Sequence, residues 1–224
     1  MNNDGVLTEL LRCVEFGKVN KTAPFPPYMR GMDGADELTL LALKHGIGPA
    51  EILNDALIRA MERVGRKFSE KKIFVPQMLM SAKAMNTAMV HLKPFFQSGE
   101  VKRRGKFIIG TVTGDLHDIG KNLVAMIVEG AGWEVIDLGV DVGSKQFIQS
   151  LQGNCDAVIG LSALLTTTMH NMKAIVQDIK SEFPAVRMII GGAPVNEQFR
   201  IEIGADGYAS DPQGAVTYLN SLVA

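Results

Sequence analysis

The chain has 224 residues, with 23 lysines and arginines against 24 aspartates and glutamates. This length suits one large domain or two small ones, and the balanced charge argues against a protein whose overall field recruits nucleic acid or an anionic membrane. The two cysteines, Cys13 and Cys155, form neither a disulfide framework nor a Cys-x-x-Cys metal pair. Because no signal-like or membrane-length apolar stretch occurs, we expect a soluble, cytoplasmic protein.

Apolar residues at helical spacing dominate the first 97 residues. We expect two domains and place the end of the first at residue 97. Four segments carry the pattern, with steps of three and four between apolar positions: 8–16, 35–43, 51–68 and 76–96. Pro76 suits the first turn of the last of these helices, where a missing N–H costs nothing. We therefore predict a small helical bundle as a domain over residues 1–97.

Two segments of this region have loop composition. Residues 18–34 contain three prolines and two glycines, which predicts an unusually long loop. Residues 98–105 are polar and basic, with glycine at positions 99 and 105. A short cationic run in a neutral chain is more typical of a solvated linker than of a nucleic-acid patch, so we expect a linker that can serve as a hinge.

After the linker, short β-branched runs alternate with helical segments, which predicts an α/β domain over 106–224. The expected strands are 106–112, 133–138, 157–161, 187–190 and 207–209. The expected helices are 119–131, 144–152, 168–183, 195–203 and 213–222. Five such units predict a doubly wound, five-stranded parallel sheet, Rossmann-like or flavodoxin-like. With the common strand order 2-1-3-4-5, a crevice lies between strands one and three.

Three unusual turns follow strands one, three and four of this sheet. They are 114–120 (GDLHDIG), the hydroxyl-rich 162–168 (SALLTTT) and 191–194 (GGAP). All three open onto the carboxyl edge, where open α/β folds bind ligands. In the first turn Asp115 can accept the second N–H of His117, an arrangement typical of a metal-binding imidazole.

Other ligands fit these turns less well. Residues 114–122 have five residues between the glycines and Asn122 after the lysine, so they do not match a phosphate-binding loop, and a dinucleotide fingerprint is absent. Asp115 and Asp118 only partly supply the aspartate cluster of a phosphoacceptor. His45, His91 and His170 lie in predicted helical segments, so a zinc cage is not indicated. One protein ligand suits a metal whose other ligands come from a macrocycle.

At this point the chain resembles the cobalamin-binding family. Asp115-x-His117-x-x-Gly120 is followed by 41 residues to Ser162-x-Leu164, and then by 26 residues to Gly191-Gly192. The three blocks agree with the family signature in residue type and in register.

The resemblance implies a role for each matching position. His117 takes the lower axial position of cobalt after the cofactor's own benzimidazole leaves, and the relay from His117 continues to Asp115 and to the hydroxyl of Thr168. The buried nucleotide tail contacts Ser162 and Thr166 and passes the glycines. The implied cofactor-binding positions of the α/β domain are Gly114, Asp115, Leu116, His117, Asp118, Ile119, Gly120, Ser162, Leu164, Thr166, Thr168, Gly191, Gly192 and Ala193.

The amino-terminal half also resembles the helical cap of methionine synthase and of small corrinoid methyl carriers, through residues 68–85 (FSEKKIFVPQMLMSAKAM). The resemblance implies that Phe68 and Val75 cover the upper face of the corrin, with Met78 nearby. A methionine-rich stripe is also typical of plain bundle core, and we assign Met85 and Met89 to that core.

The implied function is that of a methyl carrier. Cobalt(I) of a cobalamin or related corrinoid takes a methyl group, becomes the methylcobalamin form, and passes the methyl on. No substrate pocket is visible in the sequence, so the methyl-donor and methyl-acceptor methyltransferases are expected to be separate partners, with a reductive activator protein, and neither nucleic acid nor membrane. The donor is open: methanol, a methylamine, a methoxylated aromatic in an anaerobic O-demethylase, or a betaine.

Two alternatives share the signature. The small subunit of an adenosylcobalamin mutase is disfavoured by the helical cap, because radical chemistry takes place in a barrel docked on the corrin. A cobalamin-dependent sensor and transcription regulator needs a basic DNA-binding helix, and the chain's basic cluster is the linker.

Overall fold

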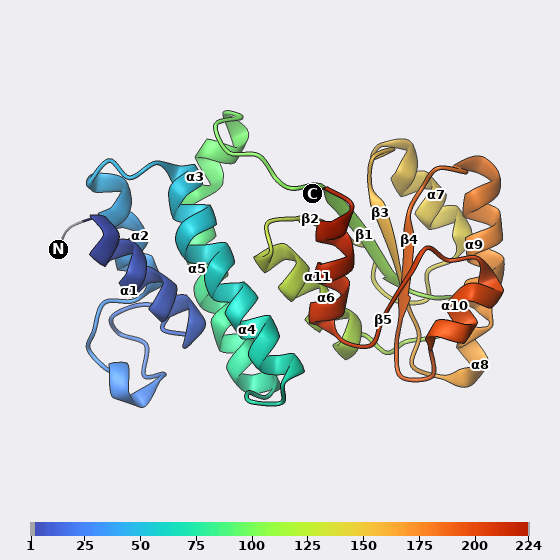
Figure 1. The fold of residues 1–224 in the computed structure, drawn as a ribbon, viewed down its shortest axis with the longest axis horizontal. Helices are drawn as coiled ribbons and strands as arrows, with labels where there is room; N and C mark the ends of the chain where they lie inside the picture. The colour runs from blue at the N-terminus through green and yellow to red at the C-terminus, as the bar shows by residue number, and fades with distance from the viewer. Residues whose placement is uncertain (1–2, 224) are drawn as a thin grey trace. The chain divides into compact units, whose positions relative to one another are not determined.

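The computed structural model describes residues 3–223 and divides the chain into two compact units (Figure 1). The first, helical unit reaches Arg103 and includes the short segment Gly130–Gly132. The second, α/β unit holds Arg104–Glu129 and the chain from Trp133 onward. Each unit is described by itself below.

The helical unit is the predicted small bundle. Its helices are α1 (Asn3–Glu15), the 3-10 turn η1 (Pro27–Met29), α2 (Ala35–Lys44), α3 (Pro49–Glu51), η2 (Ile52–Ile58), α4 (Arg59–Ser69) and α5 (Val75–Gln97). Each long helix buries one apolar stripe, as the spacing predicts, and Met78 and Met85 of α5 lie in the interior.

Residues 49–69 form one continuous helical run, but the run is not uniformly α-helical as the spacing suggested. The middle segment η2 is wound as a π-helix, and it buries Ile52, Leu53, Ala56, Leu57 and Ile58. This buried face is wider than the stripe of an α-helix. A wider turn is one way to point so many neighbouring side chains inward.

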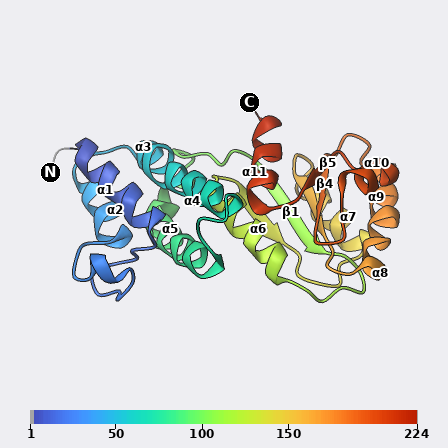
Figure 2. The ribbon, with the colours of Figure 1, turned by 60° about the horizontal axis from the view of Figure 1, so that its bottom comes forward.

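The long loop between α1 and α2 is anchored rather than loose. Lys18 is fully buried, and its ammonium donates to the carbonyl of Ala23 at 2.8 Å. The carbonyl of Lys18 in turn accepts from the N–H of Ala35 at 3.0 Å, at the start of α2. Figure 2 shows this loop beside α1 and α2.

The first part of the predicted linker folds back on the end of α5. The N–H of Val101 donates to the carbonyl of Phe95 at 3.1 Å, and Val101 is buried. The guanidinium of Arg103 lies over the ring of Phe96, 4.3 Å from its centre. Residues 98–103 are therefore held by the helical unit.

The α/β unit contains one parallel five-stranded sheet in the predicted order, β2-β1-β3-β4-β5. Its strands are β1 (Lys106–Thr111), β2 (Glu134–Asp137), β3 (Val158–Ser162), β4 (Met188–Gly191) and β5 (Gly207–Ala209). All four pairings are parallel. The fold class and the strand order predicted from the sequence are confirmed.

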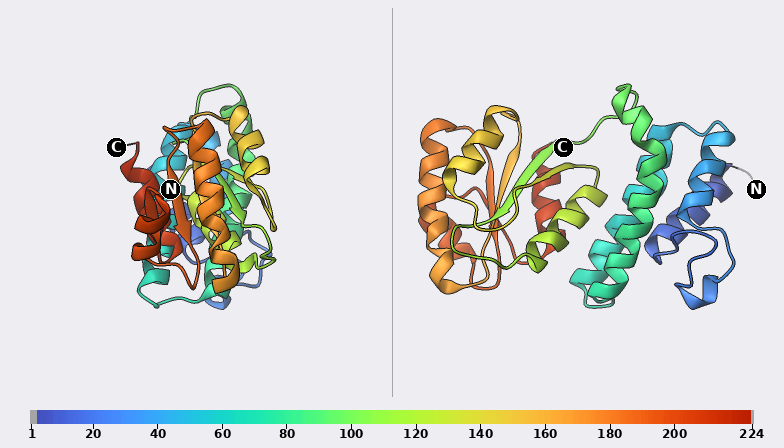
Figure 3. Two further views of the ribbon diagram at one scale, coloured as in Figure 1. Left: turned by 90° about the vertical axis from the view of Figure 1, so that its right-hand side faces the viewer. Right: turned by 180° about the vertical axis from the view of Figure 1, so that it is seen from behind.

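Helices cover both faces of this sheet, with α6 and α11 on one face and α7, α9 and α10 on the other (Figures 1 and 3). Their bounds are α6 (Ile119–Gly130), α7 (Ser144–Gln152), α8 (Thr166–Met169), α9 (Asn171–Glu182), α10 (Glu197–Ile203) and α11 (Pro212–Ser221). The predicted helix 168–183 is in fact two helices, α8 and α9, which meet at His170. The break matters for the site, because it turns the first residues of both helices toward the carboxyl edge of β1.

Candidate functional site

The three unusual turns start from strand residues that are neighbours in the sheet. Thr111 at the end of β1 pairs with Ser162 at the end of β3, and Ser162 pairs with Gly191 at the end of β4. The histidine, hydroxyl-rich and glycine turns therefore leave the same edge side by side, as the sequence predicted. Ser162 itself is half-buried.

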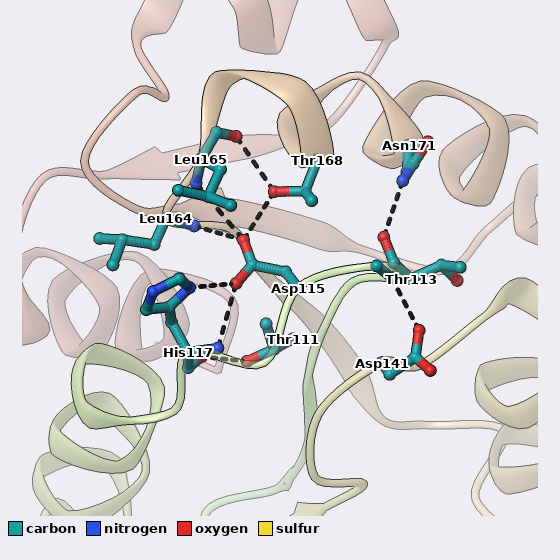
Figure 4. A network of polar contacts seen from close by, with 10 residues as sticks. Thr111, Thr113, Asp115, His117, Asp141, Leu164, Leu165, Thr168 and Asn171 are labelled. Atoms are coloured by element: carbon teal, nitrogen blue, oxygen red, sulfur yellow. Dashed lines mark hydrogen bonds and ion pairs between the residues drawn. The ribbon is translucent and has the colours of Figure 1, made fainter.

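At the centre of this edge, Asp115 and His117 form a pair. Oδ1 of Asp115 lies 2.7 Å from Nδ1 of His117 and also accepts the backbone N–H of His117 at 3.1 Å. The carboxylate is fully buried, whereas the imidazole is half exposed. The second ring nitrogen points away from Asp115 (Figure 4), and among residues 3–223 it has no hydrogen-bond partner.

The other oxygen of Asp115 is held by the hydroxyl-rich turn. Oδ2 accepts the hydroxyl of Thr168 at 2.6 Å and the backbone N–H groups of Leu164 at 2.8 Å and Leu165 at 3.4 Å. Burial alone raises the pKa of Asp115. The hydrogen bonds from Thr168, Leu164 and His117 outweigh burial and hold the pKa well below the ordinary aspartate value.

This arrangement fixes the chemistry of the imidazole. A permanently ionised acceptor at Nδ1 favours the tautomer with its proton there, which leaves the lone pair of Nε2 free. A free Nε2 on an exposed ring whose other nitrogen is held by a carboxylate is the usual form of a metal-binding histidine. The structure brings His117, Asp115 and Thr168 together as the predicted relay requires.

Large apolar side chains are exposed in the histidine turn and in the neighbouring turn after β3. Leu116 and Ile119 on either side of His117 are each 72% exposed, and Leu164 and Leu165 are 46% and 42% exposed. Exposed apolar residues gathered in this way mark a binding surface rather than a solvated turn. The sequence had placed three of these four at the site and had missed Leu165.

At two of the glycines predicted for the site, the backbone itself requires a residue without a side chain. Gly114 has φ +83°, and Gly192 has φ +127° with the position of an added Cβ only 1.8 Å from the carbonyl oxygen of Ala163. At Gly192 the backbones of the turns after β3 and β4 therefore approach each other directly. An added Cβ at Gly120, by contrast, meets nothing within 4 Å.

The remaining predicted residues of the α/β unit lie at the same edge. Asp118 is exposed and accepts from the side chain of Asn122 at 3.0 Å. Thr166 begins α8 with an exposed side chain, and Ala193 is exposed in the glycine turn. Phe68, Val75 and Met78 belong to the helical unit, where Phe68 and Val75 are half-buried and Met78 is fully buried.

The sequence analysis missed four residues that support the histidine turn. The hydroxyl of Thr111 donates to the carbonyl of His117 at 2.9 Å, and Lys121, which is buried, pairs with Asp137 at the end of β2. Asp141 and Asn171 bind the backbone just before Asp115, at 2.7 Å each. The only signal for them in the sequence was their position, near the end of a strand or near the start of a helix.

Two general features of the chain complete the description. Within residues 3–223, no helix is both long and apolar enough to cross a membrane. In the same residues, no three side chains of the His, Cys, Asp and Glu types converge into a cage for a metal ion. A metal at His117 therefore has to bring most of its own ligands.

Comparison with known proteins agrees with this geometry. The B12 binding domain family matches residues 105–217, and a second B12 binding domain family matches residues 32–93. Trimethylamine corrinoid protein 1 of Methanosarcina acetivorans is 36% identical over 193 residues, which cover 84% of this chain and 89% of that protein. Dimethylamine corrinoid protein 1 of Methanosarcina mazei is 37% identical over 183 residues, covering 80% and 85%.

A solved structure agrees as well. A chain of the methanol:cobalamin methyltransferase complex MtaBC from Methanosarcina barkeri matches with a TM-score of 0.82 at 26% identity, over 98% of this chain and 80% of that one. The family resemblance and the corrinoid cofactor inferred from the three sequence blocks are confirmed. The chain belongs to the B12-binding corrinoid proteins.

Proposed function

We propose that this protein carries a methyl group on a bound corrinoid, between a methyltransferase that supplies the methyl and one that consumes it. The observation that carries the proposal is the imidazole of His117, with Nε2 free at the surface and Nδ1 held by a buried, ionised carboxylate. When bound, the corrinoid supplies the cobalt on which a methyl group is accepted and released.

The residues present fit such a cofactor. A corrin ring supplies four nitrogen ligands of its own, so a single imidazole suffices, and the apolar surface of its ring and methyl groups suits the exposed Leu116, Ile119, Leu164 and Leu165. We assign His117 as the axial ligand. We assign Ser162, Thr166 and the turn 191–193 as the part of the edge that would hold the nucleotide tail.

The relay fixes the ring of His117. With Nδ1–H donated to Asp115, Nε2 would offer its lone pair to the cobalt. The hydroxyl of Thr168 lies 2.6 Å from Asp115 and 3.1 Å from the carbonyl of Leu165, so two acceptors are within its reach.

The partners follow from what the relatives are named for. Those relatives are trimethylamine and dimethylamine corrinoid proteins and a member of a methanol:cobalamin methyltransferase complex. We propose methyltransferase partners of this kind, working on a methylated amine, an alcohol or a related small donor in the cytoplasm, and a reductive activator for the cobalt. The helical domain, with Phe68 and Val75, is proposed to shield the upper face of the corrin, whereas Met78 is fully buried and belongs to the core of that domain.

Reconstitution of the full chain with a cobalamin in the cobalt(II) state tests the ligand. If the protein is labelled with ¹⁵N and the cofactor is not, a His117 ligand splits the electron paramagnetic resonance lines into doublets, whereas the cofactor's own base gives triplets. The doublet is expected, and it disappears in His117→Ala. Triplets in the unmodified protein, or uptake of only the adenosyl form, would overturn the methyl-carrier proposal.

A further inference from the structure

One peptide group of the histidine turn is held at both of its ends by side chains from other elements. The carbonyl of Thr113 accepts from the side-chain amide of Asn171 at 2.7 Å, and the N–H of the same peptide, on Gly114, donates to Oδ1 of Asp141 at 2.7 Å (Figure 4). Asn171 begins α9, and Asp141 lies in the turn after β2. The peptide is thus fixed from both sides of β1.

Asp141 is unusual in its own backbone. It has φ +55°, the left-handed region that favours glycine, and it is one of two non-glycine residues with positive φ among residues 3–223. Its N–H also donates to the carbonyl of Asp115 at 3.1 Å. Aspartate tolerates this conformation better than most residues, and here its carboxylate reaches the N–H of Gly114 in a neighbouring turn, which points to a role for the side chain.

The clamped peptide lies directly before Asp115. Thr113 and Gly114 are both exposed, so water can satisfy this N–H and carbonyl, and the clamp is not needed to avoid buried unpaired groups. Gly114 has φ +83°, and rotation of this peptide would turn the following residue. Asp115 has to keep contact with His117, Leu164 and Thr168 at once, which only one orientation allows.

We propose that Asp141 and Asn171 are positioning residues for the axial ligand, and the inference rests on the proposed function. By fixing the Thr113–Gly114 peptide, they hold the carboxylate of Asp115 where it binds Nδ1 of His117, and so set how much of the cofactor is bound through histidine. They act through the backbone of the turn.

Three variants of the full chain test this, all read by the ¹⁵N doublet and the fraction of cofactor bound through histidine. Asn171→Leu removes the amide donor, and Asp141→Gly removes the carboxylate while relieving the backbone. In each, the ratio of histidine-bound to histidine-free cofactor is expected to fall roughly three- to tenfold, the effect of one lost hydrogen bond. Asp141→Asn keeps an acceptor oxygen and tolerates the left-handed backbone, so a ratio within about twofold of the unmodified protein is expected.

The matched control is Asn154→Leu. Asn154 also donates from its side chain to a backbone carbonyl, that of Ser150 at 3.0 Å, but it contacts Lys106 at the opposite end of β1. The ratio of histidine-bound to histidine-free cofactor in this variant should match that of the unmodified protein. Asp141→Gly keeps the test meaningful if Asn171→Leu folds poorly, because a glycine suits φ +55°.

The outcomes separate the two proposals. A doublet in the unmodified protein with unchanged ratios in Asp141→Gly and Asn171→Leu would overturn the positioning role alone. An equal fall in the ratio of histidine-bound to histidine-free cofactor in Asn154→Leu would also overturn the positioning role, because the effect would then be one of general stability. Triplets in the unmodified protein would instead reject the ligand assignment on which both proposals depend.

Discussion

The hydroxyl of Thr168 donates to Oδ2 of Asp115 at 2.6 Å, and both groups are buried. The turn before α8 supplies the N–H groups of Leu164 and Leu165 and α8 supplies this hydroxyl, so three donors meet one carboxylate oxygen. A carboxylate held by several donors stays ionised at low pH. The charge next to His117 is therefore set by the turn after β3.

Thr168→Ala removes one bond to an ionised group, and we expect the free energy of unfolding to fall by about 2 kcal/mol. Thr168→Ser keeps the hydroxyl and loses only a methyl group, so a loss of about 1 kcal/mol or less is expected. Urea unfolding followed by the fluorescence of Trp133, the single tryptophan and buried in the α/β unit, measures both. Equal losses in the two variants would contradict the hydroxyl's role.

The lowered pKa of Asp115 predicts an acid dependence of stability. A carboxyl whose pKa is lower in the folded state stabilises the fold above its unfolded value, about 4, and that contribution is lost as pH falls toward the folded value. The difference in unfolding free energy between the unmodified protein and Asp115→Asn should therefore shrink below about pH 4. Asp206, whose pKa is also lowered, is present in both proteins and cancels.

A constant difference from neutral pH down to the acid transition would contradict a lowered pKa for Asp115. Unfolding by urea at a series of pH values, again followed through Trp133, gives the comparison directly.

The ion pair of buried Lys121 with exposed Asp137 predicts an asymmetry between its two partners. The ammonium of Lys121 also contacts Oδ1 of Asn122 at 2.7 Å, and the side chain is 2% exposed. Asp137→Ala leaves that charge without a carboxylate; because Asp137 is 38% exposed, solvent screens the pair, and we expect a loss of about 1 to 2 kcal/mol. Lys121→Met removes the charge and fills the space, so it should cost less.

The double variant of Lys121→Met with Asp137→Ala checks this explanation. It should be more stable than Asp137→Ala alone, because the unpaired ammonium is gone. Additive losses in urea unfolding would show that the charge is not the cause.

Two glycines of the site predict opposite effects of alanine. Gly192→Ala places a Cβ against the carbonyl of Ala163 in a backbone conformation that alanine disfavours, and we expect a loss of about 3 kcal/mol or more. Gly120→Ala adds a methyl in open space near the start of α6 and should stabilise the cofactor-free protein by about 0.5 kcal/mol.

If the corrin packs against Gly120, the same Gly120→Ala variant should take up cobalamin more weakly despite its greater stability. Thermal unfolding without cofactor and cobalamin titration of the same preparations separate the two effects. Unchanged affinity would place Gly120 outside the contact surface.

Much of the site could be predicted because it depends on strand ends. Once 106–112, 157–161 and 187–190 are recognised as parallel strands, their following turns must share an edge, and the register of Thr111, Ser162 and Gly191 places them side by side. The relay of His117, Asp115 and Thr168 was implied by the resemblance to the cobalamin-binding family, and the structure brings the three together. The sheet order is the common one that was assumed for such a fold.

What the sequence did not reveal acts through the backbone. Leu165 contributes its N–H to Asp115, and Asp141 and Asn171 bind the Thr113–Gly114 peptide, so their side-chain types carry no pattern that points to His117. The π-helical turn of η2 leaves the apolar spacing nearly unchanged, and the break at His170 lacks a proline or glycine. Such features are decided by packing rather than by local propensity.

The docking of residues 98–103 onto the end of α5 shortens the free chain between the two units. Gly105 is held by the α/β unit. Its carbonyl accepts the backbone N–H of Glu134 at 2.9 Å, and an added Cβ would lie 2.6 Å from the ring of Trp133. Both ends of the linker predicted from the sequence are therefore held by folded structure, and a segment expected to be loose contributes few freely rotating bonds.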